Sequence, residues 1–220
     1  MDTYRSEEEQ VEALKNWWRE NGTSTLASVA LAIGLIVGYR FWQDSQQAAR
    51  DTRAFAYQQF SQAVMVAESS PDDIKIATAG HLADGIKEQY EGSTYSQFAA
   101  LYKARQAVAD GALDAAIEEL LWVLEQQPSA DLRSLTELRL ARVYIAQQKF
   151  DDANALIDAV DTSSSFASAF AEVRGDMLLA NQDYSAAVDA YQSAQTIADA
   201  QQMQASPTLS TKLAYAKGFF

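Results

Sequence analysis

The chain lacks cysteine and has a single histidine, His81, among its 220 residues. Disulfides, thiolate chemistry, Cys-ligated zinc and a lipid-modified Cys anchor are therefore excluded. His81 near Asp84 offers no metal-ligand spacing and no catalytic pair, and neither a Gly-rich phosphate loop nor a G-x-S-x-G motif is present. We predict a protein that is not an enzyme and has no cofactor and no metal site.

Basic residues are also scarce, because 17 Lys and Arg face 30 Asp and Glu and leave a net charge of −13. Binding to nucleic acid requires clustered basic residues, so nucleic acid is not an expected partner. The acidic pairs have no EF-hand spacing, and adjacent residues on a helix point apart. We expect them to be helix caps or solvated faces: Asp72-Asp73, Glu118-Glu119 and Asp151-Asp152.

Proline occurs only at Pro71, Pro128 and Pro207, each beside a serine. Between these positions apolar residues recur at helical spacing in Ala-, Gln- and Leu-rich sequence, and no alternating strand pattern appears. The expected fold class is therefore all-α. We predict helices near 46–68, 72–89, 94–109, 112–126, 130–148, 150–160, 166–181, 183–200 and 207–217.

One long uncharged run extends from Asn21 to Tyr39. As a helix it would measure roughly 28 Å, close to the hydrocarbon thickness of a bilayer. Aromatic residues flank it, as at membrane interfaces, and the acidic residues before it exclude a cleaved export signal. We predict a single transmembrane helix over residues 23–42. Basic residues near its two ends are equal in number, so charge leaves its orientation open.

The N-terminal arm, residues 1–22, is short and acidic. Ser6 and Glu9 form a capping box for a helix over 6–20, which Asn21-Gly22 is expected to end. Such an arm fits either an interfacial helix or a docking element for a partner.

Small residues recur every four positions along the predicted span, at Ala30, Gly34 and Gly38, and the last two form a G-x-x-x-G motif. A strip of this kind lets another membrane helix approach closely. We expect this face to serve membrane-helix packing.

Three later segments share one pattern. Each opens with a small residue, carries Ala twelve positions on, and has a large apolar residue sixteen positions on. The first and last of these positions are Ala104 and Leu120, Ala141 and Ile157, and Gly175 and Tyr191.

The pattern resembles the tetratricopeptide repeat, whose period is 34 residues. We predict a solenoid domain over 43–220 with repeats near 97–130, 134–167 and 168–201, and a degenerate fourth pair over 50–90. The resemblance implies a concave groove lined by the first helix of each pair. Its positions are Phe98, Leu101, Arg105 and Val108, then Leu135, Leu138, Arg142 and Ile145, then Ala169, Glu172, Asp176 and Leu179. The segment Leu209 to Phe220 is an alternative occupant of part of this surface.

The arm EEEQVEALKNWWRENG, the span GLIVGYRFW and the Ala-rich repeat domain together resemble the ancillary SecYEG translocon subunit family of the Gram-negative inner membrane. The similarity runs from about Tyr4 to Leu213 and is most specific from Gln10 to Trp42. It implies a cytoplasmic N-terminus and a periplasmic C-terminal domain. It also implies three kinds of partner: the SecYEG translocon, a membrane-anchored periplasmic prolyl isomerase-like chaperone, and unfolded exported proteins handed onward. A periplasmic scaffold for envelope assembly or cell division is the competing interpretation.

Overall fold

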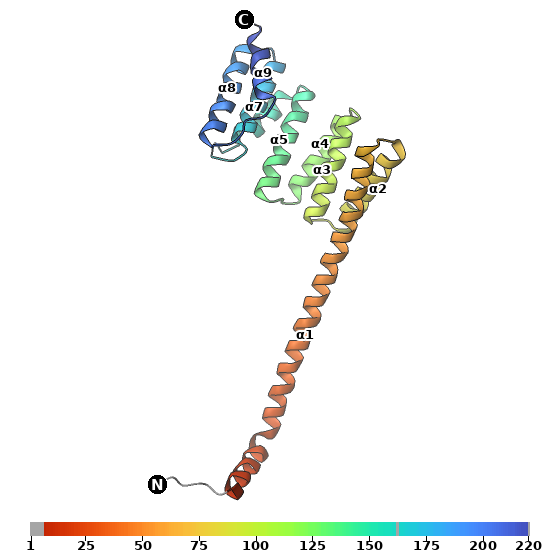
Figure 1. Ribbon diagram of the computed structural model, residues 1–220, viewed down its shortest axis with the longest axis vertical. Coiled ribbons are helices and arrows are strands. Elements are labelled where there is room, and N and C mark those ends of the chain that lie inside the picture. The colour runs from red at the N-terminus through yellow and green to blue at the C-terminus, as the bar shows by residue number, and fades with distance from the viewer. Residues whose placement is uncertain (1–6, 162, 220) are drawn as a thin grey trace. The chain divides into compact units, whose positions relative to one another are not determined.

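The structure is a computed structural model that describes residues 7–161 and 163–219. Within these residues all regular secondary structure is α-helical, which confirms the predicted fold class. Figure 1 shows the helices in chain order. Their bounds are α1 Glu7–Ser69, α2 Asp73–Gln89, α3 Thr94–Ala109, α4 Leu113–Glu125, α5 Ala130–Ala146, α6 Phe150–Asp158, α7 Ala167–Ala180, α8 Tyr184–Ala200 and α9 Leu209–Lys217.

The chain divides into two compact units, residues 1–54 and residues 55–220. In the first unit, α1 continues through Asn21-Gly22, so the predicted helix end at this dipeptide is wrong. The Asn21 side-chain amide donates to the Trp17 carbonyl at 3.1 Å, and Gly22 lies against the Trp18 ring. Backbone groups next to an apolar span must be satisfied within the helix, and this requirement overrides the local turn preference. The predicted cap residue Ser6 lies outside the described residues.

The middle of this unit carries large apolar side chains that are open to solvent on all faces. Leu31 is 68% exposed, Leu35 is 67% exposed, and the large apolar residues between Leu26 and Val37 are each more than half exposed. Exposed apolar surface costs about 25 cal/mol per Å² in water, so such a helix is stable only in an apolar medium. Among the described residues, α1 is the one helix long and apolar enough to cross a membrane.

In the second unit, consecutive helices pack as antiparallel pairs: α3 with α4, α5 with α6, and α7 with α8. The pairs α3 with α4 and α7 with α8 can be followed in Figure 1. Helix α9 packs on α8, and α2 packs on α3. The end of α1 joins α2 and α3 around Phe60, which is 4% exposed. This cluster occupies the region of the predicted degenerate fourth pair.

Within each pair, a small residue of the first helix faces a large residue of the second. Ala104 and Leu120 share one core cluster, and Ala141 and Ile157 share another. In the last pair, a Cβ added at Gly175 would lie 2.4 Å from the Tyr191 ring. Gly175 is therefore required because its partner side chain is the largest of the three.

The turn inside each pair repeats the same backbone geometry. Gly111, Gln148 and Gln182 all have positive φ, at 73°, 59° and 65°. In each turn the next residue donates its N–H to a carbonyl five positions earlier, at 2.8 to 2.9 Å, which is the Schellman bond. The two glutamines adopt this left-handed conformation at a cost of about 1 kcal/mol each, because they carry a Cβ.

The close contact at Gly175 gives a first prediction. Gly175→Ala should lower the free energy of unfolding by about 2 kcal/mol, because the new methyl group overlaps the Tyr191 ring in a packed core. Adding Tyr191→Ile should recover most of this loss by recreating the Ala141 and Ile157 combination. Thermal unfolding of the full chain in nanodiscs measures both effects, and equal stability of wild type and Gly175→Ala would refute the packing argument.

Candidate functional site

Two adjoining cavities lie along the second unit. The end of α1 lines the first together with α3 and α5, and α3, α4 and α5 line the second. The first, about 280 Å³, has an aromatic wall of Tyr57, Phe60, Phe98 and Tyr102. The second, about 300 Å³, has an aliphatic wall of Leu101, Val108, Leu120 and Val143. Leu101, Arg105 and Arg139 line both, so the cavities form one continuous surface, called here the arginine groove.

Most of the predicted groove positions of the first two repeats line this surface. Phe98, Leu101, Arg105, Val108, Leu135 and Arg142 all border one cavity or both. Leu138 and Ile145 line neither of them. Leu138 is 5% exposed and packs with Phe170 and Val173 of the next pair, and Ile145 lies against the same cluster.

Three arginines gather at the arginine groove: Arg105, Arg139 and Arg142. Arg105 pairs with Glu68 at the end of α1, at 2.5 Å. Partial burial lowers the pKa of the Arg139 guanidinium, and the positive charges of Arg142 and Arg105 lower it further. Arg139 is therefore close enough to both Arg105 and Arg142 to be repelled by their charges.

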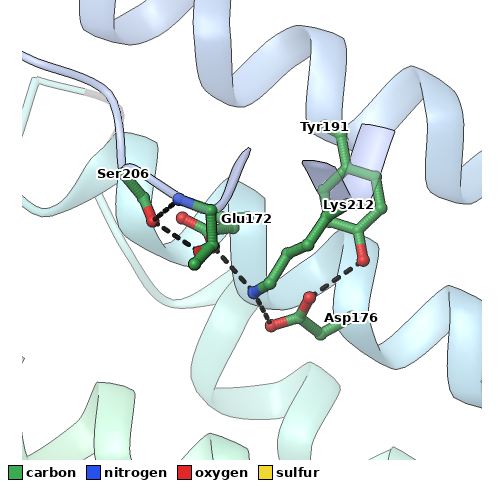
Figure 2. Close-up of polar contacts among 6 residues, drawn as sticks. Glu172, Asp176, Tyr191, Ser206 and Lys212 are labelled. Atoms are coloured by element: carbon green, nitrogen blue, oxygen red, sulfur yellow. Dashed lines mark hydrogen bonds and ion pairs between the residues drawn. The ribbon is translucent and has the colours of Figure 1, made fainter. Parts of the chain in front are cut away.

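The third repeat differs because α9 covers its first helix. Asp176 follows the small residue Gly175 just as Arg105 follows Ala104 and Arg142 follows Ala141. Figure 2 shows Lys212 of α9 between Glu172 and Asp176, with its ammonium 2.7 Å from each carboxylate. The Tyr191 hydroxyl donates to Asp176 at 2.9 Å. Burial raises the pKa of this hydroxyl, and Asp176 raises it further.

The C-terminal segment therefore covers the third repeat, as the alternative interpretation of the sequence anticipated. Leu209 of α9 is 2% exposed and packs beside Leu178 and Leu179 of α7. Phe220 lies outside the described residues. Lys212 pairs with both Glu172 and Asp176. At the arginine groove Glu68 of α1 pairs with Arg105, whereas no ion pair within residues 7–161 and 163–219 includes Arg139 or Arg142.

The acidic pairs have mixed roles. Asp72 caps α2 by accepting from the Ile74 N–H at 2.8 Å, and Asp151-Asp152 lies in the first turn of α6, as expected. Glu119 departs from the expectation, because its side chain is only 13% exposed and pairs with Lys103 at 2.9 Å and also with Lys87. It joins α2 and α3 to α4.

His81 is exposed on α2, and the neighbouring Asp84 pairs with Lys103 at 2.6 Å. Across residues 7–161 and 163–219, no three His, Cys, Asp or Glu side chains are grouped so as to hold a metal ion.

The small-residue strip of the first unit is open. Ala30 is exposed, and a Cβ added at Gly34 or Gly38 would meet no atom within 4 Å. A close approach by another helix would therefore meet only the helix backbone on this face.

Comparison with known proteins identifies the family. A family model described as a tetratricopeptide repeat-like domain matches residues 15–217. An Escherichia coli K12 protein named "Ancillary SecYEG translocon subunit" is 30% identical over 88% of this chain and 89% of its own length. The chain belongs to the ancillary SecYEG translocon subunit family.

Further relatives with the same name extend this likeness. The Haemophilus influenzae protein is 27% identical over 86% of this chain and 88% of its own, and the Neisseria gonorrhoeae protein is 24% identical over 87% and 88%. No solved structure matches the chain.

The sequence did not predict the aromatic residues Tyr57 and Phe60 or the basic residue Arg139 at the arginine groove. Tyr57 and Phe60 come from the end of α1, where the repeat pattern is too degenerate to assign groove positions. Arg139 had an available signal, because it lies four residues after Leu135 and three before Arg142, and so shares their helical face.

The Lys212 contacts give a second prediction. Lys212→Met should lower the free energy of unfolding by about 2 kcal/mol, because Glu172, whose side chain is 5% exposed, loses its cation. The triple change Lys212→Met, Glu172→Gln, Asp176→Asn should restore part of the loss. Unfolding of the full chain in nanodiscs, followed by circular dichroism, provides the measurement.

The ion pairs of Lys212 with Glu172 and Asp176 also make the free energy of unfolding depend on pH. Desolvation of Lys212 is outweighed by Asp176 and Glu172, which raise its pKa above the ordinary 10.5. Its contribution is therefore complete below pH 10.5 and is lost as the pH rises through the higher folded value. The difference in the free energy of unfolding between wild type and Lys212→Met should stay constant from neutral pH to pH 10.5 and become smaller above pH 10.5. A gap that closes near pH 8 would contradict this assignment.

Proposed function

We propose that this chain is a membrane-anchored, non-catalytic protein-binding subunit of the Sec translocon. The observation that carries the proposal is that relatives named ancillary SecYEG translocon subunits match 86–90% of the chain, and that the family model over residues 15–217 includes the apolar run. The physical features agree with it. A tetratricopeptide-like domain offers an interaction surface, and an anchor holds that surface close to an export channel at high effective concentration.

The proposal extends to topology and partners. We place the N-terminus in the cytoplasm and the repeat domain in the periplasm, with α1 crossing the inner membrane once. In that position the repeat domain would receive unfolded exported proteins and pass them to a membrane-anchored prolyl isomerase-like chaperone. The open strip of Ala30, Gly34 and Gly38 is the proposed contact with translocon membrane helices, because small residues let helix backbones approach closely.

Bulky residues on this strip test the contact. The double change Gly34→Leu and Gly38→Leu should reduce copurification of translocon subunits by about tenfold, because the added side chains keep the helices apart. Ala32→Leu provides the control, since it adds bulk on the opposite face of the same helix. A photo-crosslinking residue at position 34 should capture translocon subunits. Capture of cell-division or cell-wall proteins alone would support the scaffold interpretation instead.

Because the chain has no cysteine, its orientation in the membrane can be tested by labelling single introduced cysteines, and no native thiol of the chain reacts. Glu12 and Ser210 are both exposed, and each can be changed to cysteine in an otherwise thiol-free chain. A membrane-impermeant maleimide added to spheroplasts should label Ser210→Cys, whereas Glu12→Cys should react only after the inner membrane is permeabilised. The reverse pattern would overturn the proposed orientation.

A further inference from the structure

The arginine groove contains more arginine side chains than carboxylates that pair with them. Within residues 7–161 and 163–219, no ion pair includes Arg139 or Arg142, and only Arg105 has a carboxylate partner. These arginines gather in a chain whose net charge is −13. Guanidinium groups that repel one another without a counter-charge raise the energy of the unbound state.

The third repeat shows how such charge is satisfied elsewhere on the same surface. At the position of Arg105 and Arg142 it has Asp176, and the chain supplies Lys212 of α9 as the opposite charge. The first two repeats present the inverse arrangement: Arg105 meets Glu68 of α1, whereas Arg139 and Arg142 have no carboxylate partner among the described residues. A carboxylate from a bound partner would supply the charge that Arg139 and Arg142 lack.

The walls of the arginine groove specify what surrounds that carboxylate. Arg105 and Arg139 lie where the aromatic cavity meets the aliphatic cavity. Phe98 is 39% exposed and Val108 is 44% exposed, one on each side of this junction. A fitting ligand has apolar groups on both sides of its negative charge.

The size and symmetry of the surface favour a peptide. Cavities of about 280 and 300 Å³ are at the lower end of the roughly 300–1,000 Å³ typical of small-molecule sites, and suit single side chains. A phospholipid has acyl chains on only one side of its phosphate, and free phosphate has no apolar part. A polypeptide can place an aromatic residue, a carboxylate and an aliphatic residue in succession.

We propose that the arginine groove binds a segment of a client polypeptide in which acidic residues stand between an aromatic and an aliphatic side chain. The planar guanidinium groups of Arg139 and Arg142 hold the carboxylates through paired N–H donors, and the two cavities receive the apolar side chains. This inference rests on the proposed protein-binding function and names the class of sequence that the domain selects.

The test uses the full chain in nanodiscs of zwitterionic phosphatidylcholine, which has no net charge, and two short fluorescent peptides. One peptide has the central sequence Phe-Glu-Asp-Leu, and its twin has Phe-Gln-Asn-Leu. Fluorescence anisotropy should show the acidic peptide binding about tenfold more tightly at low salt, and the difference should shrink as salt screens the charges.

Variants separate charge from packing. The double change Arg139→Gln and Arg142→Gln should weaken binding of the acidic peptide about tenfold and leave its amide twin unaffected. Changing both arginines to Lys should restore part of the affinity, since Lys keeps the charge but loses the paired donors. Arg133→Gln is the matched control, because it removes the same charge from an exposed site on α5 that pairs with Glu137.

Several outcomes would overturn the proposal. They are equal affinity for the two peptides, full binding by the double Gln variant, and displacement of the acidic peptide by inorganic phosphate or by phosphatidylglycerol vesicles. Crosslinking from position 34 to the translocon, measured in the double Gln variant, should be unchanged. Peptide binding without crosslinking to the translocon would refute the proposed function and support the peptide site at the arginine groove. Crosslinking to the translocon without peptide binding would refute only the peptide site.

Discussion

Close contact between the two helices of each pair, permitted by one small residue, governs the rest of the repeat domain. In the last pair this residue is Gly175, which makes room for the Tyr191 ring. The ring places its hydroxyl against Asp176, and Asp176 in turn holds Lys212 of α9. The packing of Tyr191 against Gly175 in the core is therefore linked to the contact by which α9 covers the last repeat.

In the first two pairs, the side chain that packs against the small residue is aliphatic and has no hydroxyl group. Ala104 faces Leu120 and Ala141 faces Ile157, so no hydroxyl or carboxylate is introduced beside the crossing. The next residue in each is an arginine. Glu68 of α1 pairs with Arg105, whereas no ion pair in the described part of the chain includes Arg142. One repeat pattern thus yields an acidic end covered by α9 and an open basic groove, because the third repeat has Glu172 and Asp176 where the first two repeats have a leucine and an arginine.

The two units have different physical requirements. The span in the first unit exposes apolar side chains on every face and needs a membrane. The second unit buries its apolar residues between helices and leaves charged residues outside. Joining them suits a binding surface that works beside a membrane, because the tether replaces part of the affinity that a free binder would need.

The sequence alone determined the helical class, the membrane span and the small-to-large pairing, since each depends on residue spacing along one helix or between neighbouring helices. The helix end predicted at Asn21-Gly22 was wrong, because the helix on both sides outweighs the local turn preference of these two residues. The tertiary structure decided which groove positions are open. It buries Leu138 against the next pair, brings Tyr57 and Phe60 from α1 to the aromatic wall, and seats Lys212 between carboxylates far away in sequence. These outcomes depend on contacts between distant segments, which no local spacing encodes.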